Sequence, residues 1–293
     1  MYESLVEAVA EAEAEQISLG ELALRAEARE GLKTRAEIEA ALARALAVMR
    51  SAVQRGLIGD LRSVSGLVGG GVERLSRPVG PLAGTVFTDV LAAALAVQEV
   101  NAAMGVIVAA PTAGGAGVLP GVLLGLAKHR PVEDAALIRA LATAGLVGAV
   151  IAVRASLSGA EGGCQAETGA AAGMAAAAGV ELLGGSPTVA AHAVALTMQG
   201  TLGLVCDPLG GLVEVPCVYR NATGGAMALA GMEMALAGVT FPIPVDEVID
   251  TMGEIGRSMD VRYRETAGGG LAATPTGRRL AKERLVQLKG KRE

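Results

Sequence analysis

The first part of the chain is rich in charge, and its apolar residues recur every three or four positions, the spacing of an amphipathic helix. We predict helices over residues 19–30 and 35–54, the second ended by Gly56. Two short sequences mark the starts of these helices, because each has the hydroxyl and the carboxylate of a capping box: Ser18-Leu-Gly-Glu21 and Thr34-Arg-Ala-Glu37.

After residue 56 the pattern changes to long runs of Ala, Gly and Val with few charges. Proline or acidic residues stand where several runs begin, as they do in the first turns of helices. Strand-like alternation is short, and Ala and Gly are unfavourable in strands, so residues 204–205 and 212–218 are the candidates for a short extended piece. Helices are predicted after Thr88-Asp89 and over residues 135–153, 188–199 and 247–259.

These elements predict an all-α protein. A compact, Ala/Gly-rich, multi-helix domain is expected over residues 56–277, with a helical N-terminal extension over residues 1–55 laid on its surface. Residues 278–293 read as a basic amphipathic helix, which is more typical of a solvated face or a subunit contact than of a membrane anchor.

Composition limits the possible functions. Hydrophobic residues make up 52% of the 293 but aromatic residues only 2%, so small side chains and 41 glycines must build the core, which lets helices approach closely. The formal net charge of −5 argues against a nucleic-acid-binding protein. Residues 102–127 and 182–206 are uncharged, but prolines and glycines interrupt both, which favours a buried core over membrane spans. Few cysteines and no signal-peptide pattern favour the cytoplasm.

Candidate chemistry is concentrated around the three cysteines, Cys164, Cys206 and Cys217. Their spacing contains no CxxC pair, so spacing alone indicates a metal site only weakly, and inert buried thiols are the alternative. Three thiolates can also bind three corners of an iron–sulfur cube and leave the fourth iron open to a substrate. Acidic residues are rarely set so near buried thiols outside a site. Four of them lie within three positions of a cysteine: Glu161, Glu167, Asp207 and Glu214.

Several segments together resemble a known family. They are Ser156-Leu-Ser-Gly-Ala-Glu-Gly-Gly-Cys164-Gln-Ala-Glu167, Cys206-Asp-Pro-Leu-Gly-Gly-Leu-Val-Glu-Val-Pro-Cys217, Arg220-Asn221-Ala, Pro111-Thr-Ala-Gly-Gly-Ala-Gly-Val-Leu-Pro120 and Gly269-Gly-Leu-Ala-Ala-Thr-Pro-Thr-Gly277. They are similar to the signature of the iron–sulfur-dependent L-serine dehydratases (L-serine ammonia-lyases), and the match runs through most of the chain. It resembles the alpha subunit of the two-subunit bacterial form, because in single-chain members a beta region precedes this part.

The resemblance implies a lyase that eliminates water from L-serine and releases pyruvate and ammonia, in serine degradation and gluconeogenesis. It also implies a [4Fe–4S] cluster bound by Cys164, Cys206 and Cys217 in the catalytic domain. An open iron can polarise the serine hydroxyl as a Lewis acid. Candidate substrate contacts lie in the same segments: Thr112, Gly114, Gly115, Ser158, Gly159, Gln165, Arg220 and Asn221.

The Gly-rich residues 111–117 are expected to present backbone amides at a helix start, where they could bind the substrate carboxylate. A tight turn between close-packed helices is the alternative. Ala113 stands where single-chain members usually have Asn, and Ala166 replaces a common Gly. The chain ends Lys-Gly-Lys-Arg-Glu293, without the cysteine that can end single-chain members.

No general base for the α-proton is evident. His129 is expected to be exposed at a helix end, and His192, in an apolar helix, is more typical of a satisfied core histidine. The family's histidine-containing segment belongs to the beta region, so a beta subunit, in a heterodimer or a larger assembly, is expected to supply part of the site.

Three other functions compete with this one. A pyridoxal-phosphate dehydratase is disfavoured because no lysine lies in the Gly/Cys-rich region. An iron–sulfur L-cysteine desulfidase stays open, since only the leaving group differs. A non-catalytic membrane or scaffold protein with buried thiols is the alternative from another class.

Overall fold

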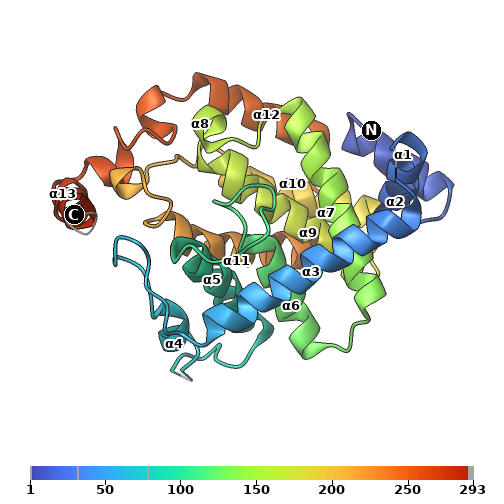
Figure 1. Cartoon of the computed structure of the whole chain (residues 1–293). Coiled ribbons are helices and arrows are strands. Elements are labelled where there is room, and N and C mark those ends of the chain that lie inside the picture. Colours follow the sequence, from blue (N-terminus) through green and yellow to red (C-terminus); the bar gives the residue numbers. More distant parts are fainter. Residues whose placement is uncertain (1, 32, 78, 290–293) are drawn as a thin grey trace.

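Helices dominate the structure, a computed structural model that describes residues 2–31, 33–77 and 79–289, with side chains as far as Arg284. Among these residues there is no strand, only an isolated bridge between Cys206 and Arg264. The all-α prediction is therefore confirmed (Figure 1). The short extended piece expected at 204–205 or 212–218 is not formed: the bridge at Cys206 lies outside both ranges, and Cys217 already begins a helix.

The helices are numbered along the chain. The α-helices are α1 (Leu5–Ala14), α2 (Leu19–Glu30), α3 (Arg35–Leu57), α4 (Gly71–Leu75), α5 (Val86–Ala102), α6 (Val118–His129), α7 (Asp134–Arg154), α8 (Gly159–Gly162), α9 (Ala170–Leu182), α10 (Pro187–Met198), α11 (Cys217–Leu236), α12 (Val245–Ser258) and α13 (Pro275–Lys289). The short turns are the π-turn η1 (Gln165–Gly169) and the 3₁₀ turns η2 (Gln199–Thr201), η3 (Leu209–Gly211), η4 (Val261–Tyr263) and η5 (Gly270–Ala273).

The predicted helix starts at the N-terminal end are confirmed by their capping bonds. Ser18 Oγ accepts a hydrogen bond from the backbone of Glu21, and Thr34 and Glu37 form both bonds of a capping box. Helix α3 continues through Gly56 to Leu57, so the predicted end at Gly56 is wrong. A Cβ at Gly56 would lie 2.3 Å from the Ala96 carbonyl oxygen, so this glycine allows α3 to pack closely on α5.

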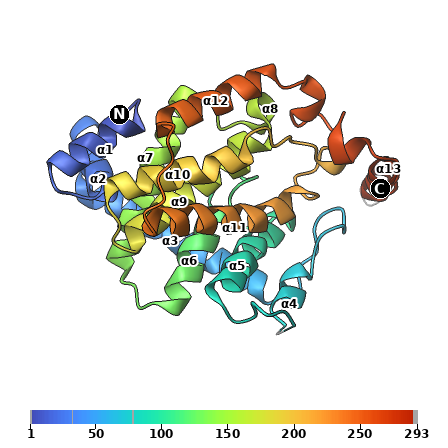
Figure 2. The ribbon, with the colours of Figure 1, turned by 180° about the vertical axis from the view of Figure 1, so that it is seen from behind.

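Helix α9 forms the centre of the core. All of its residues from Ala170 to Val180 are buried, and they are alanine, glycine, one methionine and one valine. The helix contacts α6, α7, α10 and α11, which surround it (Figure 2). Because its side chains are so small, four neighbouring helices can approach one axis, as the composition predicted.

The N-terminal helices contribute to the same core. Leu5, Leu19, Leu22, Leu46 and Met49 belong to the cluster of buried apolar side chains that contains α9. Helix α2 packs on α7, and α3 packs on α5 (Figure 1). The domain division at residues 55 and 277 stays a prediction, but helices α1–α3 are an integral part of the packing.

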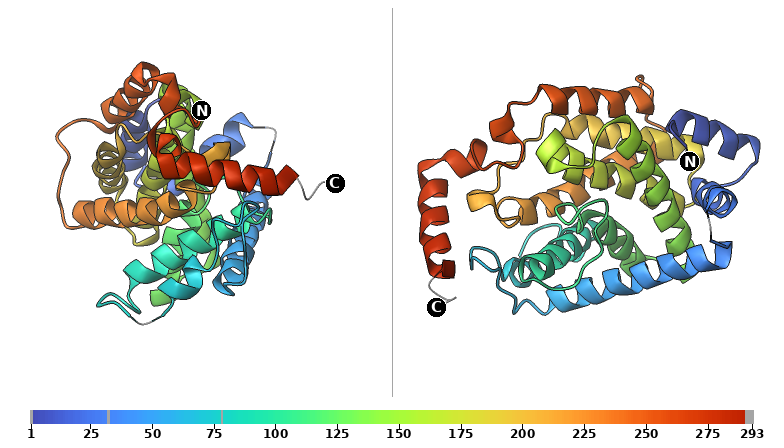
Figure 3. Two further views of the ribbon diagram at one scale, coloured as in Figure 1. Left: turned by 90° about the vertical axis from the view of Figure 1, so that its left-hand side faces the viewer. Right: turned by 45° about the horizontal axis from the view of Figure 1, so that its top comes forward.

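Helix α13 lies at the edge of the molecule, where it contacts η3 and η5, and α1 and α13 lie at opposite ends of the structure (Figures 1 and 3). The predicted basic helix over 278–293 corresponds to α13 as far as Lys289, and residues 290–293 lie outside the described residues. In the described part of the chain, one helix, α7, is long and apolar enough to cross a membrane, and 61% of its most apolar window is buried in the core.

Candidate metal centre

The fold brings together three cysteines from three separate segments. Cys164 precedes the turn η1, Cys206 follows η2 and is held by a hydrogen bond from its N–H to the Tyr263 carbonyl, and Cys217 begins α11. All three are buried and none is in a disulfide. Gly163, at φ 74°, makes the turn into Cys164, and a Cβ there would meet the Leu204 carbonyl oxygen at 2.9 Å. Only glycine fits this approach.

Arg220 supplies positive charge beside the thiols. Its Nη1 donates to the Val205 carbonyl at 2.8 Å, and its Nη2 lies 2.7 Å from Asp207 Oδ1. Burial works against the charged guanidinium, but the neighbouring Cys164 and Asp207 outweigh it and raise the pKa of Arg220. Arg220 therefore stays protonated and can balance negative charge on the sulfur atoms.

The thiols differ in how easily they lose a proton. A hydrogen bond with Cys206 lowers the pKa of Cys164 to about 7 despite burial, and the charge of Arg220 adds to this effect. The same hydrogen bond, followed by burial, raises the pKa of Cys206. Burial raises the pKa of Cys217 to about 12, and the charge of Cys164 contributes further. A bound cation would thus be needed to keep all three thiols deprotonated.

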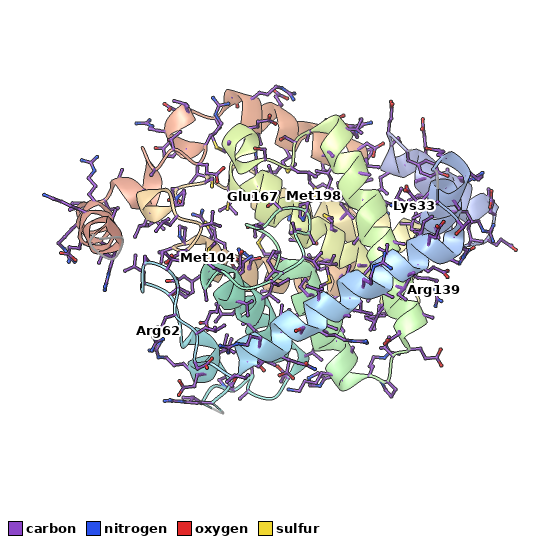
Figure 4. The ribbon with its side chains drawn as sticks, viewed as in Figure 1. Lys33, Arg62, Met104, Arg139, Glu167 and Met198 are labelled. Atoms are coloured by element: carbon purple, nitrogen blue, oxygen red, sulfur yellow. The ribbon has the colours of Figure 1, made fainter. Side chains whose placement is uncertain are left out.

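Glu167 lies in the same centre. One of its carboxylate oxygens and the sulfur atoms of Cys164 and Cys206 all lie within 4.8 Å of one another. Thr112 Oγ1 donates a 2.6 Å hydrogen bond to Glu167 Oε1. Burial raises the pKa of Glu167 against the effect of this hydrogen bond, and the charge of Glu265 raises it further. Figure 4 shows Glu167 toward the middle of the molecule, away from α13 and α1.

Glycines leave the space that the Glu167 carboxylate fills. A Cβ at Gly114 would lie 2.8 Å from its Oε1, and a Cβ at Gly159 would lie 2.6 Å from its Oε2. Gly115 packs against the backbone of the same residue, where a Cβ would lie 2.9 Å from its carbonyl oxygen. Three predicted site residues, Thr112, Gly114 and Gly159, thus contact the Glu167 carboxylate, and a fourth, Gly115, packs against the backbone of the same residue.

Asn221 ties the Gly-rich loop to the start of α11. Its Oδ1 accepts from the Gly117 N–H at 2.9 Å, and its Nδ2 donates to the Gly114 carbonyl at 2.6 Å and the Cys217 carbonyl at 2.9 Å. The backbone amides of Ala116, Gly117 and Val118 are all bonded within the protein. Within the predicted carboxylate cradle of residues 111–117, the amides of Thr112, Ala113, Gly114 and Gly115 make no hydrogen bond among the described residues.

The side chain of Gln165, like that of Asn221, forms hydrogen bonds with backbone groups of the protein. The side chain is fully buried, its Nε2 donates to the Met252 carbonyl at 3.0 Å, and its Oε1 accepts from the Gly203 N–H at 2.9 Å. Ser158 lies at the start of α8, half-buried, and its side chain makes no hydrogen bond within the described chain. Direct contact of Gln165, Asn221, Ser158 or Arg220 with a substrate stays a prediction.

His129 is exposed at the end of a helix, as predicted from the sequence, but His192 is half-buried rather than in the core. His192 Nδ1 accepts a hydrogen bond from the Phe241 N–H at 3.2 Å, which accounts for it as a structural residue. His129 ends α6, and its Nε2 lies 2.6 Å from Asp89 Oδ2. In the described part of the chain, neither residue shares a hydrogen bond or ion pair with the cysteines. Glu167 is the residue at the centre that the sequence marks only as an acidic neighbour.

Comparisons with known proteins agree with this arrangement. A family described as "Serine dehydratase alpha chain" matches residues 7–272. A probable L-serine dehydratase alpha chain of Bacillus subtilis (strain 168) is 47% identical over 296 residues, covering all of this chain and 98% of the relative. The L-serine dehydratase alpha chain of Peptoniphilus asaccharolyticus is 38% identical over 274 residues, which is 92% of this chain and 94% of that one.

Some relatives are longer. L-serine dehydratase TdcG of Escherichia coli (strain K12) is 40% identical over 255 residues, or 82% of this chain but 55% of the relative. This chain therefore spans about half of such relatives and nearly all of those named alpha chains. With the family match over most of its length and the cysteine segments assembled at one centre, the chain belongs to the serine dehydratase alpha chain family.

Proposed function

We propose that this chain is the alpha subunit of an L-serine dehydratase, an L-serine ammonia-lyase. Elimination of water from L-serine breaks the Cα–H and Cβ–O bonds and yields 2-aminoacrylate, which tautomerises and takes up water to give pyruvate and ammonia. The observation that carries the proposal is the meeting of Cys164, Cys206 and Cys217 beside Arg220 in a member of the serine dehydratase alpha chain family.

The proposed cofactor is a [4Fe–4S] cluster held by the three cysteines. The donor set fits such a group, because the thiols are buried, converge from three segments and lie beside a guanidinium that offsets the charge of thiolate ligands. When bound, the cluster would supply a Lewis-acidic iron for the serine hydroxyl. Free thiols this close together also support a reducing compartment, the cytoplasm.

The chain's own residues would hold and shape this centre. Arg220 and Asp207 orient the Cys206 segment, Asn221 fixes the Gly-rich loop against Cys217, and Gln165 joins the Cys164 turn to residue 203. The free amides of Gly114 and Gly115 are the proposed contacts for the substrate carboxylate, and the Ser158 hydroxyl is a further candidate contact.

A partner beta subunit is proposed to supply the general base. Within the described chain His192 has a structural hydrogen bond and His129 is paired with Asp89. The relatives from Bacillus subtilis and Peptoniphilus asaccharolyticus are named alpha chains. TdcG is not named an alpha chain, and it is nearly twice as long as the part of it that matches. Both observations are consistent with a site completed by a second chain.

The test is pyruvate formation from L-serine under anaerobic conditions, by this chain alone and with a beta chain encoded in the same genome. We expect turnover only with both chains, and we expect Arg220→Lys to lower it by about 10-fold or more, because lysine lacks the planar guanidinium that contacts both Val205 and Asp207. Release of sulfide from L-cysteine without pyruvate from L-serine would instead identify a desulfidase. Full activity of the single chain would refute the partner's role.

A further inference from the structure

The centre contains three donor atoms close enough together for a single ion. Donor atoms around one tetrahedral zinc or iron ion lie roughly 3.5–4 Å apart, as metal–ligand distances of about 2.0–2.3 Å require. The sulfur atoms of Cys164 and Cys206 and an oxygen of Glu167 all lie within 4.8 Å of one another, so small side-chain rotations would bring them around one ion. Cys217, the third proposed cluster ligand, is outside this group.

The contacts of Glu167 orient its carboxylate for binding a metal ion. Cys164 directly precedes the turn η1 and Glu167 lies within it, so this one short segment supplies two of the three donors. The Thr112 hydroxyl holds one carboxylate oxygen at 2.6 Å, and the missing side chains of Gly114 and Gly159 leave room for the carboxylate. A bond of this kind to a ligand's outer oxygen typically fixes its orientation toward a metal.

Charge favours a divalent cation. Two thiolates and one carboxylate carry three negative charges when they bind a metal, and Arg220, beside Cys164, supplies one positive charge. A partly buried carboxylate against two buried sulfurs is costly without a cation. Thiolate ligands select iron or zinc over the hard ions magnesium and calcium.

We infer that Cys164, Cys206 and Glu167 form a binding site for one divalent iron or zinc ion in the cluster-free chain, with Cys217 outside it and the fourth position open. The site is separate in composition from the proposed cluster, which needs Cys217 and does not need Glu167. Zinc bound there would occupy two of the cysteines that the cluster requires.

Cobalt(II) titration of the full-length, metal-free, reduced chain tests the inference without any activity measurement. Tetrahedral cobalt with thiolate ligands gives visible ligand-field bands and a near-ultraviolet sulfur-to-metal band. We expect one cobalt per chain, with an unchanged spectrum and affinity in Cys217→Ser. The sulfur-to-metal band should fall by about half in Cys164→Ser and in Cys206→Ser, because one of two thiolates is lost.

Glu167→Gln is the decisive variant. It should bind cobalt at least about 10-fold more weakly, because a charged ligand becomes a poor neutral one. Glu161→Gln is the matched control: it lies in the same segment, but its carboxylate is exposed and accepts a hydrogen bond from Ser156, so binding should not change. Helical circular dichroism establishes that each variant is folded.

Three results would overturn the inference: no stoichiometric cobalt binding by the wild type, Glu167→Gln binding that matches the wild type, or a loss in Cys217→Ser equal to that in Cys164→Ser. The proposed cluster would fail in a different way, namely if Cys217→Ser still assembled a full complement of iron and sulfide. The two proposals are therefore tested independently.

Discussion

Asp207 links the metal centre to the segment that follows α12. One carboxylate oxygen lies 2.7 Å from Arg220 Nη2, and the other accepts a 2.6 Å hydrogen bond from the Leu271 N–H. Gly270, at φ 56°, lies directly against this carboxylate, and a Cβ there would fall 2.2 Å from Asp207 Oδ2. The glycine at position 270 is thus explained by its close approach to the Asp207 side chain.

Gly270→Ala is expected to destabilise the protein by about 2–4 kcal/mol, because it combines a left-handed backbone with an overpacked contact. Gly184→Ala is the matched control: Gly184 has φ 80° with nothing within 4 Å of the position that an added methyl group would take, so it should cost only about 1 kcal/mol. Urea unfolding measures both. Equal losses in the two variants would show that the contact with Asp207 does not contribute.

The sequence was enough to select the three cysteines and the acidic residues beside them as a candidate site, because each of these acidic residues is close to a cysteine in the chain. It did not single out Glu167. The contact between Thr112 and Glu167 joins residues 55 positions apart, and a pattern along the chain contains no information about that distance. Gln165 and Asn221 were likewise chosen as substrate contacts from the sequence, which does not show that all their described hydrogen bonds are to other groups of the protein.

At the scale of elements, glycines set the distance between α5 and α6. Gly117, Gly121 and Gly125 are spaced four residues apart and face α5. A Cβ at Gly121 would lie 2.7 Å from the Cβ of Ala94, and one at Gly125 would lie 2.6 Å from a methyl group of Val90. This contact places the start of α6 and, with it, the Gly-rich loop beside Asn221 and the cysteines.

Gly121→Ala should therefore lower the free energy of unfolding by about 1–3 kcal/mol, because the two helices must move apart. Gly145→Ala, in the exposed face of α7 with nothing within 4 Å of the added carbon, should raise it by about 0.5–1 kcal/mol, because alanine is the better helix former. Thermal unfolding of both variants gives the comparison. A neutral or stabilising Gly121→Ala would contradict this account of α5 and α6.

Helix starts were only partly predictable: Thr88 and Asp89, expected to precede a helix, lie inside α5, which begins at Val86. The starts at Ser18, Thr34 and Ser186 were predictable because capping residues and first-turn prolines act locally. The end of α3 was not, because Gly56 serves a tertiary contact with α5 rather than a helix stop. A glycine can end a helix or allow close contact between two helices, and at Gly56 only the neighbouring helix α5 shows that the second applies.

At the scale of the whole molecule, the buried alanines of α9 allow the surrounding helices to pack tightly into one helical body (Figure 3). Composition predicted close-packed helices with small side chains, and the ordered motifs predicted the family. The N-terminal helices were expected on the surface, yet their apolar residues join the main core, because amphipathic patterning reveals a buried face but not what covers it.

The central claim, that Cys164, Cys206 and Cys217 together hold an iron–sulfur cluster, is tested most directly by iron and acid-labile sulfide analysis. After anaerobic reconstitution, the wild-type chain should contain about four irons and about four sulfides, as a [4Fe–4S] cluster requires. Each single Cys→Ser variant, shown to be folded by its helical circular dichroism, should lose the sulfide. Full iron and sulfide in any one of the three variants, or no sulfide in the wild type, would contradict the account.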